Sequence, residues 1–176
     1  LFRSTENSGS YMYDGAEHTA SGYEVTNISN DLYKTGDFTF SGNDKVTGTD
    51  AGTYDMELKA SDFTNNSKNF SNVEFVIVDG TLTISKRPVT LTSADDEKVY
   101  DGTALTNDEV SVGGEGFATG EGATYDVTGT QTEVGSSANA FSYILNEGTK
   151  ADNYEITKVE GTLTVDRKST RLNSSH

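Results

Sequence analysis

The sequence predicts an all-β protein made of two tandem modules, and three observations carry this prediction. Two landmarks occur twice in the same order: Tyr13-Asp14-Gly15 returns as Tyr100-Asp101-Gly102, and Gly80 to Ile84 (Gly-Thr-Leu-Thr-Ile) returns as Gly161 to Val165. Short runs rich in β-branched and aromatic residues alternate with stretches rich in Gly and Asn, which is typical of strands separated by turns. No stretch has the length and period of a stable helix. A chain of repeated small modules is more often a spacer or a multivalent binder than an enzyme.

The repeats set the expected domain boundaries. We expect a fragment start or linker over residues 1–8, one module over 9–86 and a second over 87–166. Pro88 is the only proline of the chain. It fixes its own φ and pushes Arg87 toward an extended conformation, so a short extended junction is expected there.

The two ends of the sequence look unlike the start and the end of a complete gene product. Residues 167–176 match neither module and carry basic residues but no acid, in contrast to the rest of the chain. This tail resembles a vector- or adapter-derived read-through and is left out of the fold prediction. Because the chain starts at Leu1, we expect an internal fragment of a longer protein.

Composition narrows the function classes. The 176 residues carry a formal net charge of −15, and only 32% of them are hydrophobic. Such an acidic surface disfavours nucleic acid and anionic membranes as partners, since both are polyanions. No apolar run reaches the 18 residues that a membrane-spanning helix needs, so no membrane insertion is expected. With no Cys and no Trp, the nine Tyr and eight Phe residues must supply much of the core.

The clearest local pattern predicts a β-hairpin in each module. In the first, residues 73–78 form one strand, Asp79-Gly80 a tight type I′ turn, and residues 81–85 a second strand with Leu82 and Ile84 inward. In the second, residues 154–159, Glu160-Gly161 and residues 162–165 repeat the pattern, with Leu163 and Val165 inward.

Further strands are expected at intervals typical of a β-sandwich or barrel. Their ranges are 23–28, 37–40, 54–59, 89–92, 109–112, 124–128 and 140–145.

A local signal favours a particular sandwich. The segment from Asp50 through Gly52 to Tyr54 is similar to the tyrosine corner of immunoglobulin-like domains, where the Tyr hydroxyl binds back to the backbone. The second module has Gly135 at the matching place but Ser136-Ser137 instead of a Tyr. We therefore predict two Ig-like sandwiches, with a β-grasp-like sheet as the alternative.

The charged motifs are expected to have structural roles and not catalytic or metal-binding ones. Each Tyr-Asp-Gly is expected to be a turn in which Asp accepts backbone hydrogen bonds, Gly adopts a positive φ and Tyr packs inward. Asp95, Asp96 and Asp101 are a weak candidate set for Ca²⁺, against the simpler interpretation of a solvated acidic loop. No catalytic constellation, metal site or cofactor site is predicted. A Lys–Asn isopeptide bond would suit a module without Cys, but its residues cannot be placed from the sequence.

Together, Tyr13-Asp14-Gly15 with Gly80 to Ile84, and Tyr100-Asp101-Gly102 with Asn153-Tyr154 and Gly161 to Val165, resemble the YDG and MBG domains. These repeat modules occur in tandem in large bacterial surface and adhesin-like proteins. The first module departs from the pattern, because its stretch from Asn69-Phe70 to Gly80 is longer than the stretch from Asn153-Tyr154 to Gly161.

The resemblance implies a non-enzymatic, extracellular module of the bacterial cell surface or cell wall, with neighbouring modules of the same chain as partners. The expected function is that of a stalk or spacer, with multivalent binding to host mucin, glycans or matrix protein as a second role. A pure stalk without ligand is the first alternative, and an accessory fragment of a glycan-active enzyme is a remote one.

Overall fold

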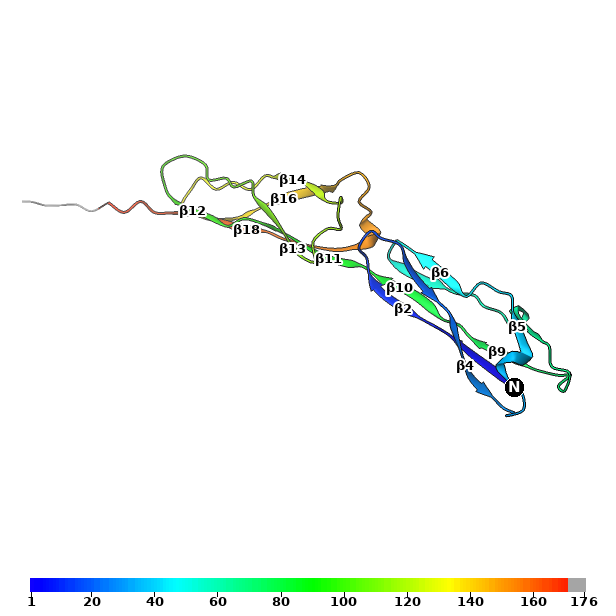
Figure 1. The fold of residues 1–176 in the computed structure, drawn as a ribbon. Coiled ribbons are helices and arrows are strands. Elements are labelled where there is room, and N and C mark those ends of the chain that lie inside the picture. The colour runs from blue at the N-terminus through cyan, green and yellow to red at the C-terminus, as the bar shows by residue number, and fades with distance from the viewer. Residues whose placement is uncertain (171–176) are drawn as a thin grey trace, which may run out of the picture. The chain divides into compact units, whose positions relative to one another are not determined.

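The computed structural model describes residues 1–170, and its chain divides into two compact units, Leu1–Lys86 and Arg87–His176 (Figure 1). The all-β prediction is confirmed: within residues 1–170 the regular elements are strands and three short 3₁₀ turns. The β-grasp-like alternative requires a helix packed on a sheet, and this part of the chain contains no α-helix. Of the predicted foreign tail, residues 167–170 form no strand and residues 171–176 lie outside the described residues.

Unit 1 contains ten strands and two 3₁₀ turns. They are β1 (Phe2–Glu6), β2 (Gly9–Met12), β3 (His18–Ser21), β4 (Tyr23–Ile28), η1 (Thr35–Asp37), β5 (Phe38–Phe40), β6 (Lys45–Gly48), β7 (Gly52–Asp55), η2 (Ala60–Asp62), β8 (Phe63–Asn65), β9 (Phe75–Val78) and β10 (Thr81–Ser85).

Unit 2 contains eight strands and one 3₁₀ turn. They are β11 (Arg87–Ser93), β12 (Asp96–Val99), β13 (Val110–Gly114), β14 (Ala123–Val127), β15 (Gly135–Asn139), β16 (Phe141–Leu145), η3 (Ala151–Asn153), β17 (Tyr154–Val159) and β18 (Gly161–Asp166).

Small sheets in each unit share one plan. Unit 1 has three-stranded sheets in the order β4-β1-β9 and β2-β10-β7, with the pairs β3-β6 and β5-β8. Unit 2 has the orders β13-β11-β17 and β12-β18-β15, with the pair β14-β16. An isolated bridge between Leu105 and Gln131 occurs in unit 2.

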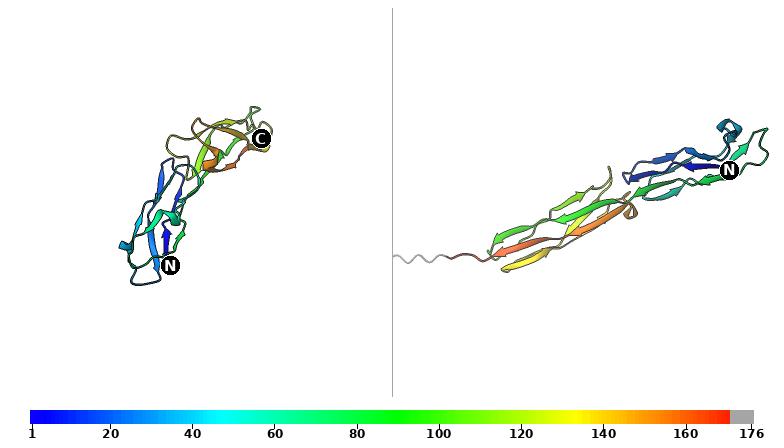
Figure 2. Two further views of the ribbon diagram at one scale, coloured as in Figure 1. Left: turned by 90° about the vertical axis from the view of Figure 1, so that its right-hand side faces the viewer. Right: turned by 90° about the horizontal axis from the view of Figure 1, so that it is seen from below.

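The predicted hairpins are wrong, because the strands on either side of Gly80 do not pair with each other. β9 pairs in parallel with β1, and β10 pairs in parallel with β2. The register is kept across the interruption: Phe2 faces Phe75 before it, and Met12 faces Ser85 after it. We call this arrangement the terminal strand pair, and its interruption the strand break (Figure 2).

Unit 2 has the same terminal strand pair, so its predicted hairpin at Glu160-Gly161 is also wrong. β11 runs parallel to β17 from Arg87 facing Tyr154, and β12 runs parallel to β18 up to Val99 facing Asp166. The break falls between the two three-stranded sheets of the unit. It therefore lets both strands leave one sheet and enter the other, as strands at the corners of β-sandwiches do.

The segment 1–8, expected to be a linker, carries the first core strand. Phe2 is fully buried and Glu6 is 4% exposed. Pro88, expected in a junction, lies inside β11. The expected strand over residues 54–59 ends early, at Asp55, because Glu57 has a φ of 60°. That left-handed conformation is unfavourable for a residue with a Cβ and breaks the strand.

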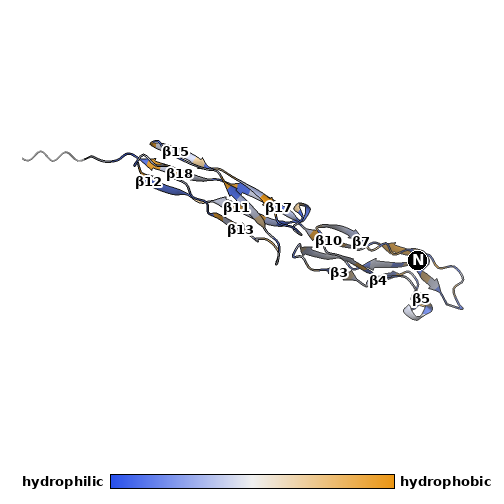
Figure 3. Ribbon diagram, turned by 90° about the horizontal axis from the view of Figure 1, so that it is seen from above, coloured by the Kyte–Doolittle hydropathy of each residue, from blue (hydrophilic) through white to orange (hydrophobic). Residues whose placement is uncertain are grey.

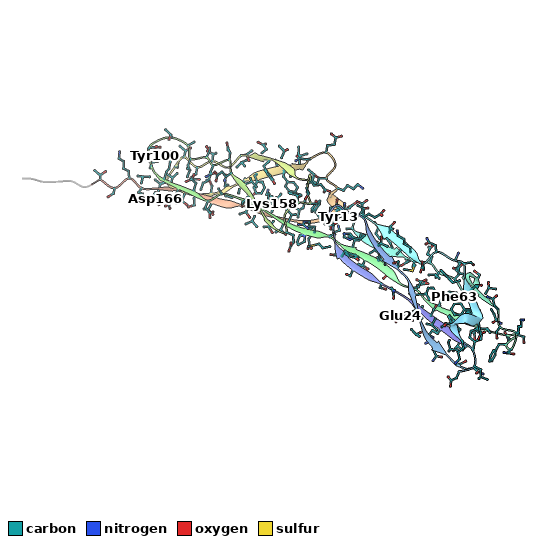
Figure 4. All side chains as sticks on the ribbon, viewed as in Figure 1. Tyr13, Glu24, Phe63, Tyr100, Lys158 and Asp166 are labelled. Carbon is teal, nitrogen blue, oxygen red and sulfur yellow. The ribbon has the colours of Figure 1, made fainter. Side chains whose placement is uncertain are left out.

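An aromatic cluster forms the core at one end of unit 1. The Phe63 ring lies 5.1 to 5.7 Å from the rings of five partners: Phe2, Tyr23, Phe38, Phe40 and Phe75. Phe63 and its neighbouring side chains are drawn in Figure 4. Phenylalanine thus supplies much of the buried apolar area in a chain with few hydrophobic residues.

Unit 2 depends more on aliphatic residues. Val89, Leu91, Leu163 and Val165 are each at most 1% exposed. Figure 3 shows apolar residues distributed among hydrophilic ones along these strands. Leu82 and Ile84, the counterparts of Leu163 and Val165 in unit 1, are 0% and 2% exposed. The alternating pattern of the sequence thus marks the buried face of the last strand in both units.

Candidate functional site

The strand break of unit 1 is held together by side chains where the backbone ladder is missing. The Glu6 carboxylate accepts hydrogen bonds from the backbone N–H of Gly80 at 2.7 Å and from that of Leu58 at 3.1 Å. The Ser8 hydroxyl accepts a third from the N–H of Thr81, also at 3.1 Å. These bonds satisfy backbone donors that would otherwise stay unpaired at the interruption.

The break of unit 2 has counterparts of the bonds to Gly80 and Thr81, but the carboxylate and the hydroxyl have exchanged places. The Ser93 hydroxyl accepts from the Gly161 N–H at 2.9 Å, and the Asp95 carboxylate accepts from the Thr162 N–H at 2.7 Å. Unit 1 therefore has a buried carboxylate and an exposed hydroxyl, whereas unit 2 has a buried hydroxyl and an exposed carboxylate. We call these four residues, Glu6, Ser8, Ser93 and Asp95, the rung residues.

A buried amide extends the network in unit 2. The Ser93 hydroxyl also donates to the backbone carbonyl of Asn139 at 2.6 Å. The Asn139 side-chain amide donates to the carbonyls of Ala94 at 3.0 Å and Asn107 at 2.9 Å. Sequence reasoning missed both Ser93 and Asn139, because a Ser and an Asn in a polar sequence carry no pattern that marks them as buried.

Gly80 and Gly161 are required by close approach of the chain and not by turn geometry. A Cβ on Gly80 would contact the Asn7 carbonyl oxygen and come within 2.8 Å of the Glu6 Cβ. A Cβ on Gly161 would lie 2.5 Å from the Ser93 carbonyl oxygen and also contact that of Ala94. Neither glycine has a positive φ. The repeated Gly therefore lies where the facing backbone comes too close to leave room for a Cβ.

Burial changes the chemistry of Glu6. Its carboxyl has a raised pKa, chiefly because burial disfavours the charged form, with the nearby charges of Asp79 and Asp62 acting in the same direction. The hydrogen bonds from Gly80 and Leu58 oppose this shift. Glu57, with its strained φ, directly precedes Leu58, and the Met56 N–H donates to the Gly80 carbonyl at 3.2 Å. The loop after β7 is thereby fixed against the strand break.

Each Tyr-Asp-Gly motif forms a turn closed by its aspartate. Asp14 accepts from the N–H of Ala16, and Asp101 accepts from the N–H of Thr103, both at 2.9 Å. Gly15 and Gly102 follow with φ values of 81° and 80°. These are Asx turns, in which the side chain replaces a backbone acceptor.

The two aspartates have different further partners. Asp14 also binds His18 Nε2 at 2.8 Å, and the His18 ring is stacked on Tyr11 at 4.2 Å. Asp101 instead accepts from Lys98 Nζ at 2.8 Å. The pKa of Asp101 lies well below its usual range, mainly because of the hydrogen bonds from Lys98 and Thr103, and the pKa of Asp14 is lowered by its bonds to Ala16 and His18.

The tyrosines of the two motifs differ in exposure. The Tyr13 N–H donates to Ser85, and the Tyr100 N–H donates to Asp166, so both extend the terminal strand pair (Figure 4). Tyr13 is 4% exposed, as expected, but Tyr100 is 36% exposed, which corrects the prediction that both rings are buried.

Tyr54 forms the expected tie to the backbone. Its hydroxyl donates to the carbonyl of Asp50 at 2.9 Å. Near Gly135 in unit 2, the Ser137 hydroxyl donates to the carbonyl of Thr130 at 3.1 Å. The Asn-aromatic landmark, by contrast, is not equivalent in the two units: Asn153-Tyr154 is buried at the start of β17, whereas Asn69-Phe70 lies in the loop before β9. The additional residues of unit 1 fall in that loop.

The acidic residues proposed for Ca²⁺ are engaged in local hydrogen bonds. Asp95 binds Thr162, and Asp96 accepts from the side chain of Asn107 at 3.0 Å. An open hollow over β12 and β18 is lined by Asp95, Asp96, Glu97, Thr162 and Thr164, without Asp101. Within residues 1–170, no group of three His, Cys, Asp or Glu residues is arranged to hold a metal ion.

A small hollow in unit 1 lies beside the first strand. Leu1, Phe2, Ile28, Tyr33 and Phe70 contribute to its lining. The Tyr33 hydroxyl lies 3.2 Å from the Asp37 carbonyl oxygen and 3.1 Å from Asn65 Oδ1, and its one proton is shared between these two acceptors. Ser29, Asn30 and Asn72 also line this hollow, so its surface is partly polar and partly apolar.

These features define a class of small, all-β repeat module. Its recurrent residues form turns, close contacts between strands and the buried face of the last strand. Residues 3–86, which make up nearly all of unit 1, match the family model described as the MBG domain, a family of non-enzymatic repeats typical of surface proteins. No curated protein and no solved structure matches the chain. Within the described residues, no helix is long and apolar enough to cross a membrane.

Proposed function

We propose that the two units are non-catalytic spacer modules of an extracellular, adhesin-like protein on a bacterial cell surface. One observation carries the proposal: the first and last strands of each unit run in parallel side by side. The chain therefore enters a unit at one end and leaves it at the other. At about 3.3 Å per residue, the stretch from Phe2 to Met12 advances the chain by roughly 30 Å.

The distribution of aromatic side chains supports a spacer over a multivalent binder. A binding function shared by both modules would place exposed aromatic residues at matching positions. Tyr11 and Tyr100 are the two exposed tyrosines, at 40% and 36%. Pairing places Tyr11 opposite Ile84 in unit 1, whereas Lys98 lies opposite the equivalent Val165 in unit 2. The exposed tyrosines are thus unmatched.

The geometry is tested by distance measurements on the full chain, whose lack of Cys allows specific labelling. One spin-label pair uses Arg3→Cys with Lys86→Cys, at opposite ends of unit 1. A matched pair uses Met12→Cys with Lys86→Cys, at the same end. We expect a distance of roughly 30 Å for the first pair and a much shorter one for the second. Equal distances would contradict the proposal.

Binding is tested separately, because a spacer needs no ligand. The immobilised full chain is exposed to a panel of mucins, glycans and matrix proteins, with an unrelated acidic protein as the control for charge. A spacer shows no saturable binding above that control. Saturable binding to one class would instead support the adhesive function, with host mucin, glycans or matrix protein as partner.

A further inference from the structure

We propose that the terminal strand pair of each unit is a shear clamp that resists a pulling force, and that the rung residues are part of this clamp. The proposal depends on the spacer function only for the source of the force. The clamp itself is a property of each unit, and it can be tested without any ligand or neighbouring protein.

The direction of the strands decides how a force acts on them. A pull on the N-terminal side of unit 1 draws β1 and β2 away from the end where β10 finishes, while a pull on the C-terminal side draws β9 and β10 the opposite way. Because the strands are parallel neighbours, these forces slide them past each other along their length. The hydrogen bonds between parallel strands are evenly spaced, so they share the force and must break together.

The strand break would be the weak point of such a clamp, since the ladder is interrupted there. The rung residues bridge it. In unit 1, the Glu6 and Ser8 side chains bind the N–H groups of Gly80 and Thr81. In unit 2, Ser93 and Asp95 bind those of Gly161 and Thr162. All four bonds join the first strand of a unit to its last strand across the strand break, so a pull that slides these strands past each other must also break them.

The bonds of Glu6 and Ser93 are sheltered from water. Glu6 is 4% exposed and Ser93 is 1% exposed. Removing one partner of a buried hydrogen bond leaves a desolvated donor without compensation, which costs more than losing an exposed bond. We therefore expect these two residues to contribute more to the clamp than the exposed Ser8 and Asp95.

The test is single-molecule pulling of the full chain through two introduced cysteines. Arg3→Cys with Lys86→Cys applies the force in shear across unit 1. Met12→Cys with Lys86→Cys applies it at one end, so that the hydrogen bonds open one after another. We expect the rupture force in shear to be several times that in the opening geometry. Equal rupture forces would overturn the shear clamp.

The rung residues are tested in the shear geometry with the side-chain change Glu6→Gln. The amide keeps one acceptor oxygen, and its NH₂ group cannot accept the second bond. A lower rupture force is expected. The control is Phe40→Leu in β5, which reduces core packing outside the terminal strand pair. If Phe40→Leu lowers the rupture force as much as Glu6→Gln at matched loss of thermal stability, the rung residues have no special part in the clamp.

The outcomes separate this inference from the spacer proposal. A ligand found in the binding panel would contradict the pure spacer and leave the two pulling geometries unaffected. Equal rupture forces combined with the expected label distances would remove the clamp and leave the spacer in place.

Discussion

Glu6 and Gly80 lie far apart in the sequence, yet a carboxylate oxygen of Glu6 accepts a 2.7 Å hydrogen bond from the Gly80 backbone N–H. In unit 2, Ser93 and Gly161 form the equivalent contact at 2.9 Å. Gly80 and Gly161 each start the most recognisable repeated motif of the chain. Their hydrogen-bond partners, Glu6 and Ser93, belong to no recognisable sequence pattern.

We expect Gly80→Ala and Gly161→Ala to destabilise their units by about 1–3 kcal/mol or more, because the added methyl group collides with backbone of the facing strand. Chemical denaturation followed by circular dichroism measures the change. Gly36→Ala is the control, since a Cβ there has nothing within 4 Å. Equal stability of the three variants would contradict the close approach.

Stability of unit 1 should depend on pH through Glu6. The pKa of Glu6 is raised in the folded state, so the folded protein binds this proton more tightly than the unfolded one. Relative to Glu6→Gln, which does not titrate, the wild-type protein should gain free energy of unfolding as the pH falls through the raised pKa toward the unfolded value of about 4.3. Asp79 and Asp62 also face this site and repel the charged form.

The measurement is a series of denaturant titrations of both proteins from neutral to acidic pH. The quantity compared is the difference in free energy of unfolding between wild type and Glu6→Gln. If this difference stays constant over the series, or shifts against the wild type on acidification, burial does not disfavour the charged form of Glu6.

The pH dependence of stability through Asp101 should have the opposite sign to that through Glu6. Its pKa is held well below the usual range by Lys98 and Thr103, so its contribution to stability is present above the unfolded value of about 3.9 and is lost as the pH falls toward the folded pKa. Asp101→Asn should lower the melting temperature at neutral pH, and by less at high salt, since salt screens the exposed pair with Lys98. A change that is independent of both salt and pH would contradict an electrostatic role.

Phe63→Ala should destabilise unit 1 by about 3–5 kcal/mol, because it removes the ring that joins five aromatic neighbours. Ile144→Ala is the matched control in an exposed position, since Ile144 is 77% exposed. Its effect should stay within about 0.5 kcal/mol. Comparable losses in the two variants would mean that the aromatic cluster does not hold the core of unit 1.

An internal isopeptide bond is not expected in the described part of the chain. Such a bond needs a buried lysine, and every lysine in residues 1–170 is at least partly exposed. Lys158 donates to the carbonyl of Phe141 at 2.6 Å and pairs with Glu160 at 2.9 Å, and it is exposed to solvent. The intact mass should equal that of the sequence, and a loss of one ammonia would contradict this expectation.

The all-β class, the buried face of the last strand of each unit and the Asp-Gly turns could be predicted from the amino-acid sequence. These features depend on local physics: alternation places Leu82 and Ile84 on one face, and a short side chain followed by Gly favours an Asx turn. The MBG resemblance rested on the same local motifs, and the family comparison confirmed it for unit 1.

The pairing of the strands could not be predicted from the sequence and became visible in the folded structure. A strand, a Gly and a second strand are compatible with a hairpin, and equally with two strands that each pair with a distant partner. Phe2 and Phe75 come together because burying both rings stabilises the fold, and that gain depends on partners remote in sequence. The strand break, the buried Glu6 and the role of Gly80 follow from that choice of partner, which no local pattern encodes.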